Sequence, residues 1–248
     1  MNNVFSNREL KNAGVEVLPN GNVKTYNKTG YMRNFLCLVS EEFCKDAITN
    51  DGIALEVGIG MGAVLHELIN KGKKNIVGVD KEKKHIEIAN KLLNKIADSR
   101  NKINFSLIHD SLPDLKKIKN KLFSNILCAQ VLHYMTPFQF KHALKRLCGL
   151  LIKGGRLYIT IGTPYIKVYK SFLKEYRKRK KNGDKYPGFM KNVSKYHPDG
   201  ANHNFGQFLF FEPKILKARL KEAGFKVIYS GYVNKDNRDQ AGIIAVKK

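Results

Sequence analysis

Residues 54–62, Ala-Leu-Glu-Val-Gly-Ile-Gly-Met-Gly, constrain the fold of this chain more than any other stretch. The run begins with apolar residues that have the length and composition of a central parallel strand, covered on both faces. Gly58, Gly60 and Gly62 follow and permit a tight turn against which a ligand can approach the backbone closely. An apolar helical stripe comes next. The order of strand, glycine loop and helix predicts a nucleotide site in an α/β sheet.

Three acidic residues stand at or near the ends of predicted strands. Glu56 interrupts the first strand, and since a buried carboxylate without a partner is costly, we expect it to face the ligand crevice. Asp80 ends the apolar run 76–80, where a carboxylate can bind a pair of ribose hydroxyls. Asp110 ends the run 103–110. These positions predict a row of polar groups along one edge of the sheet.

The glycine loop alone does not decide the ligand, because it also fits the G-x-G-x-x-G/A fingerprint of NAD enzymes. Asp80 suits either cofactor. Asp110 is followed by Ser111, which can hydrogen-bond an adenine edge, and NAD folds have no standard need for that residue.

These segments together resemble the class I S-adenosylmethionine-dependent methyltransferases, from about Asn34 to the end of the chain. The family's E/D-x-G-x-G-x-G loop corresponds to residues 56–62, its ribose acid to Asp80 and its adenine acid to Asp110. The resemblance implies a Rossmann-like α/β fold. Its seven-stranded, mostly parallel sheet has an antiparallel last strand and helices on both faces. It also implies S-adenosylmethionine as cofactor and S-adenosylhomocysteine as product.

The resemblance continues through the later strands. The fourth strand is predicted at 125–134, and the next at 151–161, with the family's paired-glycine turn near its start. Residues 222–225 are predicted to end a helix and feed a strand, and the last strand lies near 242–246. The order of these motifs matches the family.

The resemblance assigns cofactor contacts to the loop, the acids and their neighbours: Glu56, Gly58, Gly60, Gly62, Asp80, Lys81, Asp110, Ser111 and Gln130. His133 and Tyr134, just past the fourth strand, are the candidate catalytic residues. A histidine is suited to take a proton from an acceptor near neutral pH. The alternative for His133 is that it packs, caps the next helix or shapes the cofactor pocket.

Composition bounds the chain to one catalytic domain. With 248 residues and 43% hydrophobic content, it can bury one doubly wound core but not two. No run of about 18 apolar residues and no apolar signal segment occurs, so we expect a soluble, cytoplasmic protein without a membrane span, as a monomer or homodimer. The four cysteines form no C-x-x-C pair, which favours reduced thiols over a zinc site.

The chain has a formal net charge of +24, and one segment within a predicted insertion at 164–211 is especially rich in basic residues. Its basic residues include Lys170, Lys174, Arg177, Lys178, Arg179, Lys180, Lys181, Lys185 and Lys191. A connection of this length is typical of a lid or substrate module. We expect a basic helix with Tyr165, Val168, Phe172 and Tyr176 on one side, ended by Pro187 and Gly188. His197 and His203 follow, without a third residue at metal-ligand spacing, and no metal site is predicted.

The N-terminal region, 1–33, is predicted to form a small flap. Residues 15–26 alternate around Asn20 and Gly21, which indicates a hairpin. Tyr31 and Arg33 are candidates for cofactor contact, because in the family this segment can close over the methionine end. Residues 34–163 would then form the cofactor-binding core, and 212–248 would complete it.

The methyl acceptor stays open at this stage. The fourth strand ends without the D/N-P-P-Y/F motif of enzymes that methylate exocyclic amines of bases, and Cys128 lacks the proline expected of cytosine-C5 enzymes. A small-molecule O- or N-acceptor is favoured. RNA or another polyanion bound by the basic insertion is one alternative. A binding or effector protein without methyl transfer is another, and an NAD-dependent dehydrogenase is a distant third.

Overall fold

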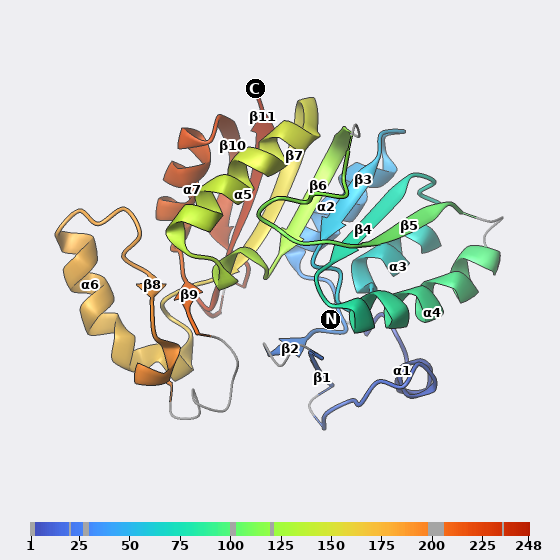
Figure 1. Cartoon of the computed structure of the whole chain (residues 1–248), viewed down its shortest axis with the longest axis horizontal. Helices are drawn as coiled ribbons and strands as arrows, with labels where there is room; N and C mark the ends of the chain where they lie inside the picture. The colour runs from blue at the N-terminus through green and yellow to red at the C-terminus, as the bar shows by residue number, and fades with distance from the viewer. Residues whose placement is uncertain are drawn as a thin grey trace. The chain divides into compact units, whose positions relative to one another are not determined.

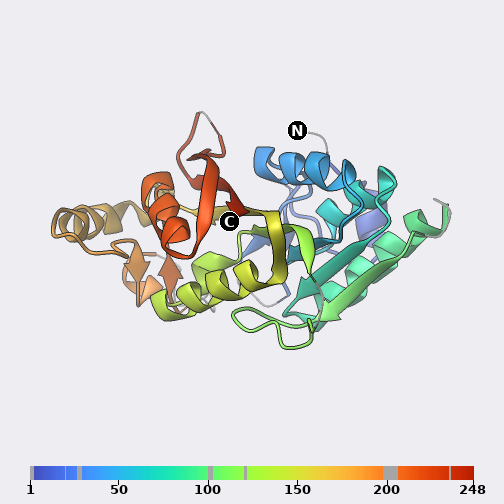
Figure 2. The same ribbon diagram turned by 90° about the horizontal axis from the view of Figure 1, so that it is seen from above.

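The computed structural model describes residues 3–19, 21–26, 30–99, 103–119, 122–197, 206–234 and 236–248 (Figures 1 and 2). Its helices are α1 (Asn7–Asn12), α2 (Leu38–Ile48), α3 (Ala63–Asn70), α4 (Lys83–Ser99), α5 (Pro137–Leu150), α6 (Leu173–Lys181) and α7 (Pro213–Glu222), with short 3-10 helices η1 (Leu132–Tyr134), η2 (Lys167–Phe172) and η3 (Val193–Lys195). Its strands are β1 (Val23–Lys24), β2 (Tyr31–Met32), β3 (Ala54–Val57), β4 (Ile76–Asp80), β5 (Phe105–His109), β6 (Phe123–Ala129), β7 (Leu151–Gly162), β8 (Phe189–Met190), β9 (Phe208–Leu209), β10 (Phe225–Tyr232) and β11 (Gln240–Lys247).

Seven strands form one sheet in the order β10-β11-β7-β6-β3-β4-β5. Strand β3 pairs parallel with β4, and β4 pairs parallel with β5. The last strand, β11, runs antiparallel to both of its neighbours, β7 and β10. The predicted seven-stranded sheet with an antiparallel last strand is therefore confirmed.

The fourth strand of the sheet, β6, is shorter than the predicted 125–134. It ends at Ala129, because Gln130 adopts a left-handed φ of 57° and turns the chain out of the extended conformation. His133 and Tyr134 therefore lie in the 3-10 helix η1 rather than in a strand. The sequence signal failed here because Gln130 is not a residue type that usually marks such a turn.

The chain divides into two compact units, residues 1–127 and 128–248. In the first unit every residue of β3 and β4 is buried, as expected of strands covered on both faces. Helix α4 packs along β4 and β5 (Figure 1), and its buried stripe includes Ile88, Leu92 and Leu93. A Cβ on Gly78 in β4 would lie 2.6 Å from Leu65 Cδ1, so the absence of a side chain there lets α3 approach the sheet.

The N-terminal flap is held to the first unit by Asn34. The Phe5 N–H donates to Asn34 Oδ1 at 2.9 Å, and Asn34 Nδ2 donates to the Phe5 carbonyl at 2.6 Å. The predicted hairpin at 15–26 is reduced to a single antiparallel bridge between Val17 and Val23, and Asn20 lies outside the described residues. The paired flap strands are instead β1 and β2.

In the second unit, the insertion carries a small aromatic core of its own. Its buried members are Tyr169, Phe172, Tyr176, Met190, Val193, Phe208 and Phe210. The basic helix exists as η2 and α6, but it ends at Lys181, before the predicted Pro187 and Gly188. Asn182 and Gly183, with a φ of 77° at the glycine, already provide a helix end, and Val168 is exposed rather than on the packed side.

Gly188 tests the packing of this insertion. A Cβ at this position would lie 2.0 Å from the backbone oxygen of Phe210, and backbone cannot yield as a side-chain tip can. We expect Gly188→Ala to destabilise the protein by about 3 kcal/mol, measured by urea unfolding. Gly149→Ala is the control, because nothing lies within 4 Å of its Cβ and alanine favours the helix. Equal stability of the two variants would contradict this packing.

Candidate functional site

The glycine loop joins β3 to α3 in the first unit. Gly58, Gly60 and Gly62 have φ values of 83°, 54° and 87°, in the left-handed region that favours glycine. The Gly58 N–H donates to the Val79 carbonyl at 2.7 Å, which ties the loop to β4. The three glycines predicted from the sequence are therefore each required by the backbone conformation.

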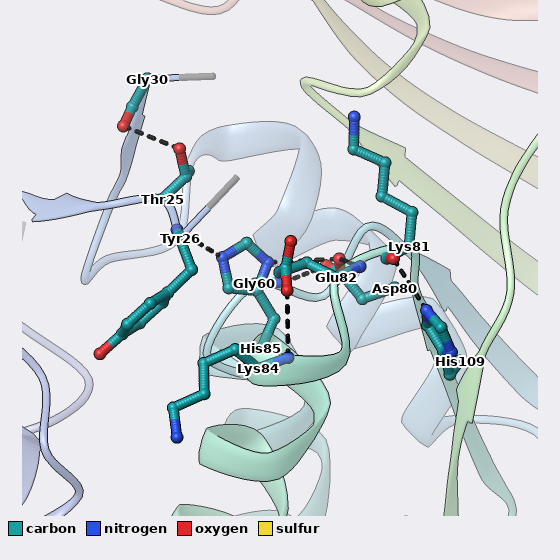
Figure 3. A network of polar contacts seen from close by, with 10 residues as sticks. All are labelled: Thr25, Tyr26, Gly30, Gly60, Asp80, Lys81, Glu82, Lys84, His85 and His109. Atoms are coloured by element: carbon teal, nitrogen blue, oxygen red, sulfur yellow. Dashed lines mark hydrogen bonds and ion pairs between the residues drawn. The ribbon is translucent and has the colours of Figure 1, made fainter. Parts of the chain in front are cut away.

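Asp80 lies at the end of β4, with 6% of its surface exposed, and its carboxylate holds the glycine loop (Figure 3). Its Oδ2 accepts the Gly60 N–H at 2.9 Å, and its Oδ1 accepts the Glu82 N–H at 2.8 Å. The Nδ1 atom of His85 lies 3.2 Å from the same Oδ1. The predicted ribose acid is thus fixed in orientation and bonded to the predicted loop.

Glu56 is the second acid of this loop and has a different environment. It is 4% exposed, and its buried Oε2 has no hydrogen-bond partner among the described residues. Burial, together with the nearby Asp80 carboxylate, raises the pKa of Glu56 well above its ordinary value. A buried polar atom that the protein leaves unpartnered is suited to a ligand that donates a hydrogen bond or carries a positive charge.

Asp110 organises the loop that follows β5. Its Oδ1 accepts the Ser111 N–H at 2.8 Å, and its Oδ2 accepts the Lys117 N–H at 2.7 Å. The Asp110 N–H donates to the Asp80 carbonyl at 3.1 Å, which places the two acids on adjacent strand ends. Ser111 is exposed.

Lys81 contributes its backbone to the same edge. Its carbonyl accepts a hydrogen bond from His109 Nε2 at 2.9 Å, while its exposed side chain extends away from His109 (Figure 3).

Met32 of the flap lies against the glycine loop. A Cβ built on Gly60 would be 2.7 Å from Met32 Sδ, so the flap strand β2 rests directly on this glycine. Tyr31 is 56% exposed, and Arg33 is exposed and stacks on Phe35 with 5.4 Å to the ring centroid. Side chains alternate along a strand, so the residue between the two predicted contacts is the one that meets the loop.

The remaining predicted site residues belong to the second unit. Gln130 follows β6 and is partly buried; its N–H donates to the Thr160 carbonyl at 2.8 Å, and its side-chain Nε2 donates to Thr160 Oγ1 at 3.1 Å. A non-glycine residue held at positive φ stores backbone strain, a feature that clusters at functional sites.

His133 in η1 is 7% exposed and surrounded by aromatic rings. The ring centroid of Tyr134 lies 4.1 Å from that of His133, and that of Phe208 lies 5.4 Å away. Its Nδ1 is buried without a hydrogen-bond partner in the described structure. Burial lowers the pKa of His133 to about 3, so the imidazole is neutral near pH 7.

This burial predicts an acid-labile fold. Since the folded-state pKa of His133 lies below the unfolded value of about 6.5, the unfolded chain binds a proton that the folded protein does not. We expect stability to be fully present above pH 6.5 and to fall by up to about 1.4 kcal/mol per pH unit as the pH drops towards 3. In His133→Asn this part of the slope should vanish, measured by urea unfolding from pH 4.5 to 7.5. An unchanged slope in His133→Asn, or the same loss in the exposed His142→Asn, would contradict it.

The basic residues of the insertion divide into two groups. Lys180 binds Glu212 at 2.7 Å, and Arg179 pairs with Glu175 and donates to the Phe189 carbonyl at 2.6 Å, so both have structural roles. The others are exposed to solvent: Lys170, Lys174, Arg177, Lys178, Lys181, Lys185 and Lys191.

The insertion histidines do not form a metal site among the described residues. His197 lies beside the ring of Tyr169, with 5.5 Å between centroids, and His203 is outside the described ranges. No group of three or more His, Cys, Asp or Glu side chains in the described part of the chain is placed to hold a metal ion.

Two residues that contact Asp80 or the glycine loop escaped the sequence reasoning, His85 and Met32. His85 stands five positions after Asp80, in the first turn of α4, so its spacing offered a weak signal. The contact of Met32 with Gly60 joins residues 28 positions apart and depends on how the flap folds back.

Comparison with known proteins agrees with this geometry. Residues 54–155 match the family described as a methyltransferase domain. No match appears among the sequences of curated proteins. Among solved structures, magnesium protoporphyrin IX methyltransferase from Synechocystis shares 14% identity over 85% of this chain and 84% of its own, with a TM-score of 0.56.

Two further structures have the same fold. An S-adenosylmethionine-dependent methyltransferase from Clostridium acetobutylicum shares 14% identity over 84% of this chain and 90% of its own, with a TM-score of 0.57. The N1-methyltransferase of 1,6-didemethyltoxoflavin from Burkholderia thailandensis shares 15% identity over 85% and 79%, also at 0.57.

The seven-stranded sheet gives the chain the Rossmann-like fold of these solved methyltransferase structures. The match to a methyltransferase domain covers residues 54–155, which include the glycine loop, Asp80 and Asp110. None of the helices in the described ranges has the length and apolar character needed to cross a membrane.

Proposed function

We propose that this protein transfers the methyl group of S-adenosylmethionine to an oxygen or nitrogen atom of a small-molecule acceptor and releases S-adenosylhomocysteine. The observation that carries the proposal is the buried Glu56, whose Oε2 has no hydrogen-bond partner among the described residues, beside a loop of three left-handed glycines. Such a loop leaves backbone groups open to a ligand, and the carboxyl group is suited to bind a positively charged group of that ligand.

The residues of the first unit fit this cofactor chemically. Asp80 Oδ2 accepts one N–H, from Gly60, which leaves acceptor capacity for a ribose hydroxyl. Glu56 would hold a cationic group of the cofactor, and Asp110 with Ser111 would bind the adenine edge. When bound, the cofactor supplies a methyl group already activated by its sulfonium, so the protein mainly has to position the acceptor.

The acceptor class rests on two kinds of support. Two of the similar solved structures are of enzymes named for small-molecule substrates, magnesium protoporphyrin IX and 1,6-didemethyltoxoflavin. Several aromatic residues of the insertion, among them Tyr169, Phe172 and Tyr176, pack into its own core, and its exposed lysines face solvent, which fits a solvated module. The rings buried in this core are unavailable for stacking on bases.

We assign His133 and Tyr134 to the binding of the methyl acceptor. We assign Gln130, with its strained backbone, to the binding of the cofactor. With a pKa of about 3, His133 would act as a neutral hydrogen-bond acceptor through its unpartnered Nδ1, rather than as a base that titrates near neutral pH. The pH profile of kcat/KM between 6 and 8 should then show no inflection that His133→Asn removes.

The functional division follows the elements. We assign residues 1–33 to a flap, 34–163 to cofactor binding and 164–211 to substrate binding, and we propose that 212–248 complete the core. The four cysteines all lie within the described ranges and form no disulfide, which supports a reducing compartment such as the cytoplasm as the proposed location.

The test is a methyl-transfer assay with isotopically labelled cofactor. Panels of small phenols, hydroxyl compounds, amines and carboxylates are compared with total RNA, and S-adenosylhomocysteine release is measured in parallel. Label transferred to a small O- or N-acceptor supports the proposal. Label on RNA alone, with binding that weakens steeply as salt rises, would replace it with an RNA-directed enzyme. Cofactor binding without transfer across all panels would indicate a binding protein.

A further inference from the structure

His85 occupies a buried position between the flap and the predicted ribose acid (Figure 3). It lies in the first turn of α4 and is 3% exposed. On one side, its Nδ1 is 3.2 Å from Asp80 Oδ1; on the other, its Nε2 is 3.2 Å from the backbone nitrogen of Tyr26. One imidazole therefore joins two segments that are more than fifty residues apart in the sequence.

The Tyr26 contact fixes the tautomer of His85. A backbone N–H can only donate, so Nε2 of the ring must be the acceptor and carries no proton. The proton of the neutral ring is then on Nδ1, from which it is donated to the Asp80 carboxylate. The two hydrogen bonds are thus directional, from Tyr26 through His85 to Asp80.

The three donors to Asp80 are distributed unevenly. Within the described ranges, Oδ1 accepts from His85 and from the Glu82 N–H, whereas Oδ2 accepts from the Gly60 N–H alone. Since each carboxylate oxygen has two lone-pair sites, the remaining capacity of Asp80 lies on Oδ2, on the side of the glycine loop. His85 therefore occupies the oxygen turned away from the loop and helps to aim the other one at it.

The flap end of this chain of bonds is itself ordered. Thr25 donates to the Gly30 carbonyl through both its N–H, at 2.9 Å, and its Oγ1, at 3.0 Å. The Tyr26 hydroxyl donates to the Gly14 carbonyl at 2.9 Å. Met32 rests on Gly60, so the flap meets the glycine loop at one point and His85 at another.

We propose that His85 is a positioning residue that couples the N-terminal flap to the ribose-binding carboxylate of Asp80. The inference rests on the proposed function, because it takes a ribose-bearing cofactor as the ligand of Asp80. A ligand that tightens the Asp80 network stabilises the flap through His85, and by reciprocity a seated flap strengthens ligand binding by the same factor.

Two substitutions separate the halves of the bridge. His85→Asn can keep a side-chain N–H near the place of Nδ1 and lacks the acceptor that reaches Tyr26. His85→Gln can place its amide oxygen near Nε2, keeping the Tyr26 contact, and lacks the donor to Asp80. The readouts are hydrogen exchange at the Tyr26 amide and calorimetric binding of S-adenosylhomocysteine. Lys84→Ala is the control, because Lys84 is an exposed neighbour on the same helix whose ammonium pairs with Glu87.

Without ligand, the Tyr26 amide hydrogen of His85→Asn should exchange about tenfold faster than that of wild type. The loss of S-adenosylhomocysteine affinity in His85→Asn should be smaller than the loss in His85→Gln. His85→Gln should keep the wild-type exchange rate and bind about tenfold more weakly. In wild-type protein, bound S-adenosylhomocysteine should slow hydrogen exchange at the Tyr26 amide relative to the ligand-free protein. In the two His85 variants, the ligand should not change this exchange rate. Lys84→Ala should behave as wild type.

Wild-type affinity and wild-type Tyr26 exchange in both His85 variants would overturn the inference. An equal loss of affinity and an equal change in Tyr26 exchange in both variants would also overturn the inference. A merely structural role of His85 would affect both readouts alike in the two variants. If wild-type protein binds no S-adenosylhomocysteine, the proposed function and the coupling fail together. The contact of His85 with the flap is then judged separately, from the ligand-free exchange rates.

Discussion

Replacement of Asp80 with alanine is expected to weaken the binding of S-adenosylhomocysteine by about 100-fold or more. The variant loses the acceptor for a ribose hydroxyl and also leaves the N–H groups of Gly60 and Glu82 and the Nδ1 of His85 without their partner. The glycine loop and the start of α4 are then no longer held together. Because Asp80 is buried, the same change should lower the free energy of unfolding by about 3 kcal/mol.

The affinity effect can be measured by calorimetry well below the melting temperature, so that folded protein is compared. Asp98→Ala is the matched control, since Asp98 is an exposed acid on α4, the helix that follows Asp80 in the sequence. Asp80→Asn retains one oxygen acceptor and should recover part of the stability. Full affinity in Asp80→Ala would show that the ligand does not use this carboxylate.

Substitution of Glu56 by glutamine is expected to remove a pH dependence from the protein. The folded-state pKa of Glu56 is raised by burial and by Asp80, so the folded protein binds more protons than the unfolded chain above about pH 4.5. Its contribution to stability is complete below that pH and is lost as the pH rises through the folded-state pKa. As the pH rises above about 4.5, the free energy of unfolding of wild-type protein should therefore fall relative to that of Glu56→Gln, by up to about 1.4 kcal/mol per pH unit.

The same variant tests the role of Glu56 in cofactor binding. A positively charged ligand group beside Glu56 favours its ionised form, so wild-type protein should release up to about one proton on binding S-adenosylhomocysteine. Calorimetry in buffers of different ionisation enthalpy measures this release. Glu56→Gln should release none and bind about tenfold more weakly. Identical proton release in the two proteins would exclude Glu56 from the cofactor site.

Features fixed by neighbouring residues could be predicted from the sequence. The buried strands, the three glycines with left-handed φ and the acids at the strand ends are set by residue type and short spacing, and the structure contains them all. Helix α7 ends at Glu222, at the start of the predicted helix end 222–225, for the same reason.

Features set by tertiary contacts, or by residue types that are unusual for their backbone conformation, could not be predicted from the sequence. The bond from Tyr26 to His85 spans 59 positions and needs the flap in place before it forms. Strand β6 was predicted too long, because Gln130 has a left-handed backbone conformation that is uncommon for its residue type. The basic helix was predicted too long, because Pro187 was chosen as its end although Asn182 and Gly183 come first.

The measurement that tests the central claim most directly is a calorimetric titration of wild-type protein with S-adenosylmethionine, S-adenosylhomocysteine and NADH, repeated with Asp80→Ala. The account predicts saturable binding of both adenosyl compounds at one site, no binding of NADH, and loss of the adenosyl binding in Asp80→Ala. Binding of NADH in place of the adenosyl compounds, or adenosyl binding that is unaffected by Asp80→Ala, would contradict it.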